Sequence, residues 1–85
     1  MAITLLYFAW VRERIGTGEE QVDPPEAVRN LADLIDWLAQ RSDGHAAAFA
    51  EPARLRAAID QTFVPLDALL GSAREVAIFP PVTGG

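Results

Sequence analysis

The strongest structural signal in the sequence is Asn30-Leu31-Ala32-Asp33-Leu34-Ile35-Asp36-Trp37-Leu38-Ala39-Gln40-Arg41. Its apolar residues recur at i, i+3, i+4 and i+7, which predicts an amphipathic helix over residues 31–41 that buries one face. Asn30 is a favourable N-cap, and Asp33 stands where a capping box has its acidic partner. Arg41 suits the carboxyl end, and Asp43-Gly44 predict the end of the helix.

The segments around this helix have the composition of strands. Residues 3–11 form an apolar run of β-formers and predict a central strand. After the turn Gly16-Thr17-Gly18, residues 19–22 predict a second, antiparallel strand, which Pro24-Pro25 stops. The first half of the chain therefore predicts a hairpin in front of the helix.

The second half of the chain predicts another hairpin. Residues 55–59 and 62–64 read as strands around an Asp60-Gln61 turn, and residues 75–79 as a final strand. A short helical turn is expected over residues 45–50, before Pro52. Two hairpins on either side of a helix predict an α+β roll, with the helix packed across one face of the sheet.

Composition limits the possible functions. The chain has 85 residues, a net charge of −5 and no cysteine, which fits one small domain without disulfides or a thiol nucleophile. The acidic balance argues against binding to nucleic acid or to an anionic membrane. We expect no membrane span and no signal peptide, and we therefore expect a cytoplasmic protein.

The sequence changes character after residue 79, where it ends in Pro80-Pro81-Val82-Thr83-Gly84-Gly85. Because proline disfavours helix and the glycines lack Cβ atoms, we expect a domain over residues 1–79 and a flexible tail over residues 80–85. An α-carboxyl group with a pKa of about 3.3–3.7 is an anion at neutral pH and a poor electrophile. The terminal carboxylate would need activation with ATP. Since the chain has no phosphate loop, we expect it to be a substrate, not a catalyst.

Three phenylalanines are candidates for a docking surface near this tail. Strand alternation places Ile3, Leu5 and Tyr7 on one face of the first strand and Thr4, Leu6 and Phe8 on the other. The same argument turns Val76 and Ile78 inward and Phe79 outward, and it separates Phe63 from Val64. Exposed aromatic side chains commonly mark protein interfaces. The predicted exposed set is Phe8, Phe63 and Phe79.

The ending Phe79-Pro80-Pro81-Val82-Thr83-Gly84-Gly85 closely resembles that of molybdopterin synthase small subunits, and the resemblance runs the full length of the chain. It includes the opening Leu6-Tyr7-Phe8-Ala9-Trp10-Val11-Arg12-Glu13 and the hairpin Asp60-Gln61-Thr62-Phe63-Val64, where the family usually has Asn at position 60. The resemblance implies a ubiquitin-like β-grasp fold with a mixed sheet. It departs at Ala73-Arg74, where the family commonly has Gly-Asp, and this puts the turn and an acidic contact there in doubt.

The resemblance also implies a mechanism and partners. An adenylyltransferase of the ubiquitin-activating type would adenylate Gly85 with ATP, and a sulfur donor would convert it to a thiocarboxylate. The tail would then deliver sulfur to a cyclic pyranopterin phosphate inside the large synthase subunit, in a heterotetramer. No cofactor would be bound permanently. The implied partner-binding residues are Phe8, Phe63, Phe79, Pro80, Pro81, Val82, Thr83, Gly84 and Gly85.

Three other functions stay open from the sequence. A sulfur carrier of another pathway, such as thiamine thiazole synthesis, would use the same thiocarboxylate. A ubiquitin-like modifier would instead join Gly85 to lysines of target proteins. A non-covalent interaction domain would not need its tail. The single histidine, His45, predicts no metal site, and the turn at residues 16–18 lacks the lysine of a phosphate loop.

Overall fold

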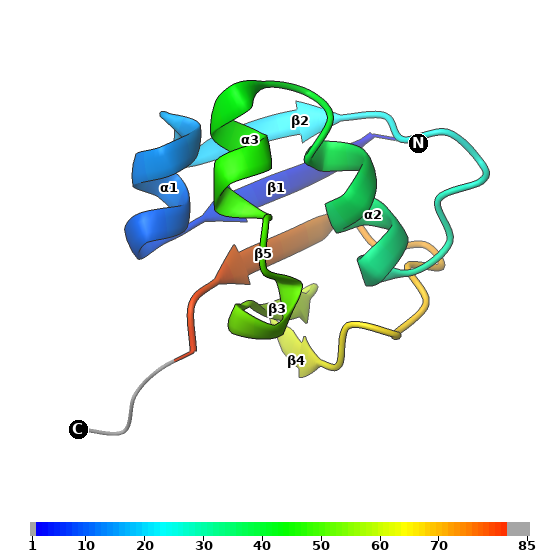
Figure 1. Ribbon diagram of the computed structural model, residues 1–85. Helices are drawn as coiled ribbons and strands as arrows, with labels where there is room; N and C mark the ends of the chain where they lie inside the picture. Colours follow the sequence, from blue (N-terminus) through cyan, green and yellow to red (C-terminus); the bar gives the residue numbers. More distant parts are fainter. Residues whose placement is uncertain (1, 82–85) are drawn as a thin grey trace.

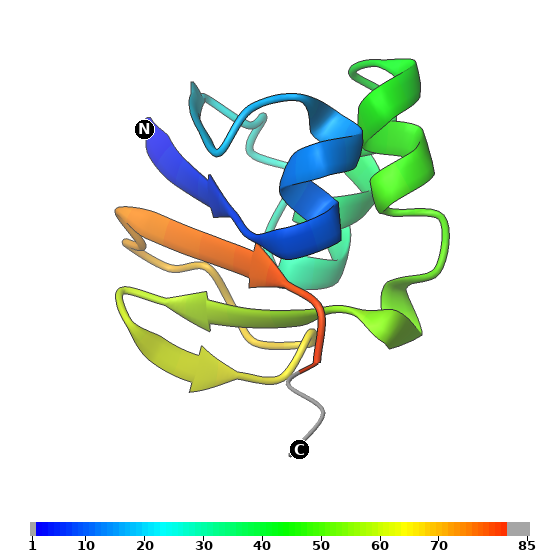
Figure 2. The same cartoon turned by 90° about the vertical axis from the view of Figure 1, so that its left-hand side faces the viewer.

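The computed structural model describes residues 2–81. A sheet forms one layer, and helices α1, α2 and α3 all lie on one of its faces (Figure 1). The side view in Figure 2 shows that the opposite face carries no helix. This two-layer arrangement is the α+β β-grasp roll that the sequence predicts.

The sheet has five strands in the order β2-β1-β5-β3-β4. They are β1 (Ile3–Tyr7), β2 (Glu19–Val22), β3 (Arg56–Ile59), β4 (Thr62–Val64) and β5 (Glu75–Phe79). The central pair, β1 and β5, is parallel, whereas β1–β2, β3–β4 and β3–β5 are antiparallel. The sheet is therefore mixed, and the predicted strands at 19–22, 62–64 and 75–79 are confirmed.

The prediction of one strand over residues 3–11 is wrong at its end. The strand stops at Tyr7, and residues Ala9–Ile15 form the helix α1. Ala9 takes a positive φ of 53°, which turns the chain out of the sheet. Val11 is fully buried and Ile15 half-buried, so they form an i, i+4 apolar pair that favours helix over strand.

Helix α2 spans Leu31–Leu38 and is shorter than predicted. The Asn30 side chain accepts a hydrogen bond of 2.8 Å from the Asp33 N–H, which confirms the N-cap. The Asp33 carboxylate accepts from the N–H of Arg29 at 3.2 Å, one residue earlier than in a standard capping box. At the other end, the N–H groups of Gln40 and Arg41 bond to carbonyls three residues back, so the last turn tightens and the α-helix stops.

The expectation that Asp43-Gly44 ends a helix is wrong, because these residues begin α3 (Asp43–Ala48). Ser42 caps this helix by accepting a hydrogen bond from the His45 N–H at 3.1 Å. A Cβ on Gly44 would collide with the Arg14 carbonyl oxygen of α1. Glycine therefore permits the close contact between α1 and α3. A short 3₁₀ helix, η1 (Pro52–Arg54), leads into β3.

The core lies between the sheet and the helices. The apolar stripe of α2 is almost completely buried, as are the inward side chains of β1 and β5. This is the burial that the i, i+3, i+4, i+7 spacing and the strand alternation predict. The most deeply buried large side chains are Tyr7, Leu5, Leu31, Leu34, Ile35, Leu38, Leu55, Ile78, Val11 and Val76.

Candidate functional site: the open sheet face and the start of the tail

The candidate site begins where β5 ends. Phe79 is the last residue of this strand, Pro80 is half-buried and Pro81 is exposed. The rest of the predicted tail, Val82-Thr83-Gly84-Gly85, lies outside the described residues. The division of the chain into a domain over residues 1–79 and a flexible tail over residues 80–85 stays a prediction, as does the role of Gly85.

A row of apolar side chains crosses the face of the sheet that carries no helix. Strand register aligns Leu6 of β1 with Ala77 of β5, then with Ala58 of β3 and Phe63 of β4. Because alanine is small, the middle of this row forms a low floor between larger side chains. Ala58 is buried and Leu6 and Ala77 are half-buried, so the exposed apolar area of this row lies mainly at Phe63.

Three rings stand along this floor, and we call Phe8, Phe63 and Phe79 the aromatic surface. The Phe8 and Phe63 side chains are 48% and 80% exposed, and Phe79 is half-buried. Ring centroids are 6.5 Å apart for Phe8–Phe79 and 5.7 Å apart for Phe63–Phe79, within the range of aromatic pairing. The predicted face assignment is confirmed, and the three residues come together next to Pro80. Their role in binding a partner stays a prediction.

The β3–β4 turn fixes the position of Phe63 relative to β5. Asp60 and Gln61 both have positive φ, 47° and 72°, as a two-residue type I′ hairpin requires. The Asp60 carboxylate accepts hydrogen bonds from the N–H groups of Arg74 and Glu75, at 3.1 and 3.0 Å. The first residue of β5 and the residue before it are thus tied to the hairpin despite the departure at Ala73-Arg74. That departure leaves an exposed arginine at this corner.

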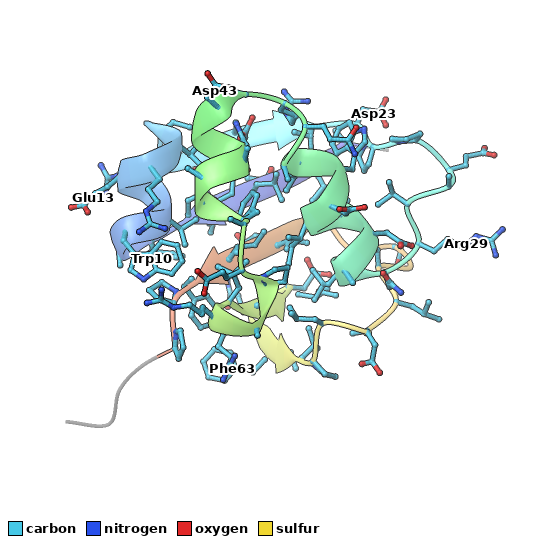
Figure 3. The ribbon with its side chains drawn as sticks, in the orientation of Figure 1. Trp10, Glu13, Asp23, Arg29, Asp43 and Phe63 are labelled. Carbon is cyan, nitrogen blue, oxygen red and sulfur yellow. The ribbon has the colours of Figure 1, made fainter. Side chains whose placement is uncertain are left out.

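A second cluster, which the sequence did not predict as a unit, lies on α1 and η1. The guanidinium carbon of Arg14 is 4.5 Å from the Trp10 ring centroid, and that of Arg54 is 5.8 Å away. The i, i+4 spacing of Trp10 and Arg14 would have revealed the first contact had residues 9–15 been recognised as a helix. Nothing in the local sequence brings Arg54 to the same ring. Figure 3 shows Trp10 on one side of the end of β5 and Phe63 on the other.

A polar network ties α3 to the edge of the sheet. The Glu20 carboxylate accepts a hydrogen bond from the Tyr7 hydroxyl at 2.8 Å and pairs with His45 Nε2 at 2.6 Å. Arg41 lies 3.6 Å from its other oxygen, and His45 Nδ1 lies 2.7 Å from the Ser42 hydroxyl. His45 is therefore a buried structural residue that holds α3, an assignment that its place in the sequence did not reveal.

Ionisation in this network follows from its contacts. Burial alone would raise the pKa of the Glu20 carboxyl, but the hydrogen bonds from His45 and Tyr7, and the nearby charges of His45 and Arg41, hold it below its ordinary value. Burial, followed by the hydrogen bond to Glu20, raises the pKa of the Tyr7 hydroxyl far above its ordinary value. At neutral pH Tyr7 is therefore a hydrogen-bond donor and Glu20 a charged acceptor.

Residues 2–81 contain no group of three or more metal-ligating acidic or histidine side chains placed to hold an ion. Within the same range, none of the helices reaches the length and apolar character needed to cross a bilayer.

The chain resembles three curated proteins named molybdopterin synthase sulfur carrier subunit. The Escherichia coli protein is 45% identical over 85 residues, which cover 98% of this chain and 99% of the relative. The Haemophilus influenzae protein is 40% identical over 83 residues, with coverage of 98% and 99%. The Mycobacterium tuberculosis protein is 34% identical over 86 residues, with coverage of 98% and 96%.

Solved structures share the fold. A Pyrococcus furiosus protein, described as a proposed molybdopterin converting factor subunit 1, superimposes with a TM-score of 0.74 at 26% identity and covers 96% of this chain and 99% of its own. The SAMP1 protein of Haloferax volcanii superimposes with a TM-score of 0.71 at 21% identity over the whole of both chains, which speaks for the fold alone. The family model for ThiS proteins matches residues 5–85. The chain therefore belongs to the ThiS family.

Proposed function

We propose that this protein is the sulfur carrier subunit of a molybdopterin synthase. The observation that carries the proposal is the 45% identity, over nearly the whole of both chains, to a relative with that name. The Gly84-Gly85 ending supports it, because it offers a terminal carboxylate without neighbouring side chains. On this proposal the protein catalyses no step by itself.

The chemistry would take place at the Gly85 carboxylate in two stages. A separate adenylyltransferase joins the carboxylate to the α-phosphate of ATP and releases pyrophosphate. Sulfide-level sulfur from a donor then attacks the acyl carbon, breaks its bond to AMP and leaves a thiocarboxylate. Adenylation is needed because an ionised carboxylate resists attack by nucleophiles.

The transfer stage would take place on the second subunit of the synthase. The thiocarboxylate sulfur forms a C–S bond in place of a C–O bond of the cyclic pyranopterin phosphate, and water then cleaves the acyl C–S bond, so that Gly85 returns to a carboxylate. Each carrier brings one sulfur, so two carriers supply the two sulfurs of the dithiolene. The aromatic surface next to Pro80 would hold the carrier on the large subunit while the tail enters its active site. Two carriers on a dimer of large subunits would form the heterotetramer.

The proposal is tested by mass spectrometry of the intact protein after incubation with ATP, the adenylyltransferase and a sulfur source. We expect replacement of one terminal oxygen by sulfur in the full chain. A variant without Gly84-Gly85 is the control and should keep its mass. If the full chain shows no change, or the truncated chain shows the same change, the proposal is wrong.

The same incubation separates the proposal from a modifier function. A ubiquitin-like modifier would give covalent adducts between Gly85 and lysines of other proteins in a cell extract. A carrier would give the thiocarboxylate and no such adducts. A thiamine-type carrier would also form the thiocarboxylate, but its sulfur would not reach the pyranopterin.

A further inference from the structure

The cluster of Trp10, Arg14 and Arg54 forms a cationic site beside the aromatic surface. Both guanidinium groups lie within 6 Å of one indole ring, at 4.5 and 5.8 Å, the range of a cation–π contact. Arg14 also donates to the Ala47 carbonyl oxygen at 3.5 Å, which fixes it against α3. Two like charges thus lie at the same indole ring.

This site carries an excess of positive charge. Glu51 lies 3.9 Å from Arg54, in a contact between side chains that are 69% and 62% exposed. No carboxylate of residues 2–81 lies within 4.0 Å of the Arg14 guanidinium. The Arg14 guanidinium is therefore left without an anionic partner in the described part of the chain, and Arg54 has only a weak, solvated ion pair with Glu51.

The two chain segments that carry this site are themselves net positive. Residues 9–15 and 51–56 hold four arginines and two glutamates, whereas the other residues hold three arginines and ten carboxylates. A protein with a net charge of −5 thus has a locally cationic segment. Such separation of charge favours an oriented approach to a partner with the opposite pattern.

The cationic site continues into the aromatic surface. Phe8 directly precedes α1, which carries Trp10 and Arg14. On the other strand, Arg56 is the register partner of Phe79. The cationic site itself lies in the helix layer, beside Ala47 of α3, and it adjoins the aromatic surface where Phe8 leads into α1.

We propose that Trp10, Arg14 and Arg54 form a preorganised site for carboxylate side chains on the large synthase subunit, at the rim of the surface that covers the phenylalanines. The inference rests on the proposed function, because it takes the large subunit as the occupant. Stacking on Trp10 lowers the side-chain entropy that the arginines lose on binding, and planar guanidinium groups suit bidentate carboxylate contacts. The site would increase the association rate and fix orientation, while the phenylalanines supply most of the affinity.

The test compares the double variant Arg14→Gln/Arg54→Gln with Arg29→Gln, as full chains binding to the large subunit by calorimetry and stopped flow. Arg29 is an exposed arginine at the opposite end of the molecule (Figure 3). For two exposed ion pairs at a rim, we expect roughly 3- to 30-fold weaker binding in the double variant. We expect no such loss for Arg29→Gln. The difference should shrink as salt is raised, since about 0.15 M salt already screens charges beyond about 8 Å.

Further variants make the outcome decisive. Arg14→Lys/Arg54→Lys keeps both charges but loses the planar guanidinium groups, so its affinity should lie between those of the unaltered chain and the double glutamine variant. If circular dichroism shows that the double glutamine variant does not fold, Arg54→Gln alone is used, because its side chain is 62% exposed. Equal affinity of the glutamine variants and Arg29→Gln for the large subunit overturns the proposal. So does a loss of affinity for the adenylyltransferase that leaves binding to the large subunit unchanged. If the unaltered chain does not bind the large subunit at all, the proposed function fails first.

Discussion

Truncation of Phe63 to alanine should weaken binding to the large subunit and leave the fold almost intact. Phe63 is 80% exposed, and its ring pairs with that of Phe79, with the centroids 5.7 Å apart. Loss of one such contact costs at most about 1.5 kcal/mol of folding stability. Burial of a phenylalanine at the centre of an interface is worth about 2 kcal/mol or more, which corresponds to roughly 30-fold in Kd.

Leu69→Ala provides the matched control, because Leu69 is 73% exposed and does not belong to the aromatic surface. Calorimetric titration gives Kd for each variant, and urea denaturation gives the free energy of unfolding. We expect Phe63→Ala to lose roughly 30-fold in affinity and Leu69→Ala to lose almost none, with both variants folded. Phe79→Ala should also weaken binding in a folded protein. A docking role for Phe63 is refuted if Phe63→Ala binds like the control, or if the substitution unfolds the protein.

Three further predictions concern the scaffold. Gly44→Ala should lower the free energy of unfolding, measured by urea denaturation, by about 2 kcal/mol or more, because the new Cβ collides with the Arg14 carbonyl. The control is Ala46→Gly at an exposed α3 position, which should lower it by only about 1 kcal/mol. Ala9→Gly should raise the melting temperature by a few degrees, since a φ of 53° costs alanine about 1 kcal/mol and glycine little; a lower melting temperature would contradict this. Because the pKa of Glu20 is depressed in the folded protein, its charged form stabilises the fold above the ordinary glutamate value of 4.5, and the free energy of unfolding should fall as the pH drops below that value. Glu20→Gln should be less stable at neutral pH and should lose less stability on acidification. Parallel pH profiles of stability for the two proteins would disprove the stabilising role of Glu20.

Local patterns predicted the parts of the fold that depend on a single element. The stripe of α2, the alternation in β5 and the Asp60-Gln61 turn each carry their own signal, and the structure confirms all three. The same alternation placed Phe8, Phe63 and Phe79 outside, and they do lie outside the core. These residues could be predicted because side-chain direction in a strand has a period of two.

The missed features depend on contacts between distant segments. Trp10-Val11 continues the apolar run of β1, so a strand was predicted where the burial of Val11 against the helix layer favours α1. The network of Glu20 and His45 joins residues 25 positions apart, and no sequence period signals such a pair. The approach of Arg54 to Trp10 likewise follows only from the packing of η1 near α1.

The most direct test of the account is sulfur transfer in a single turnover. The thiocarboxylated chain is mixed with the large subunit and the cyclic pyranopterin phosphate, and the pterin product and the mass of the carrier are followed together. We predict that the pterin gains its dithiolene sulfurs while the carrier returns to the mass of its carboxylate form, and that a chain without Gly85 supplies none. A carrier that keeps its sulfur in the presence of both components, or a dithiolene that forms equally well without Gly85, would contradict the account.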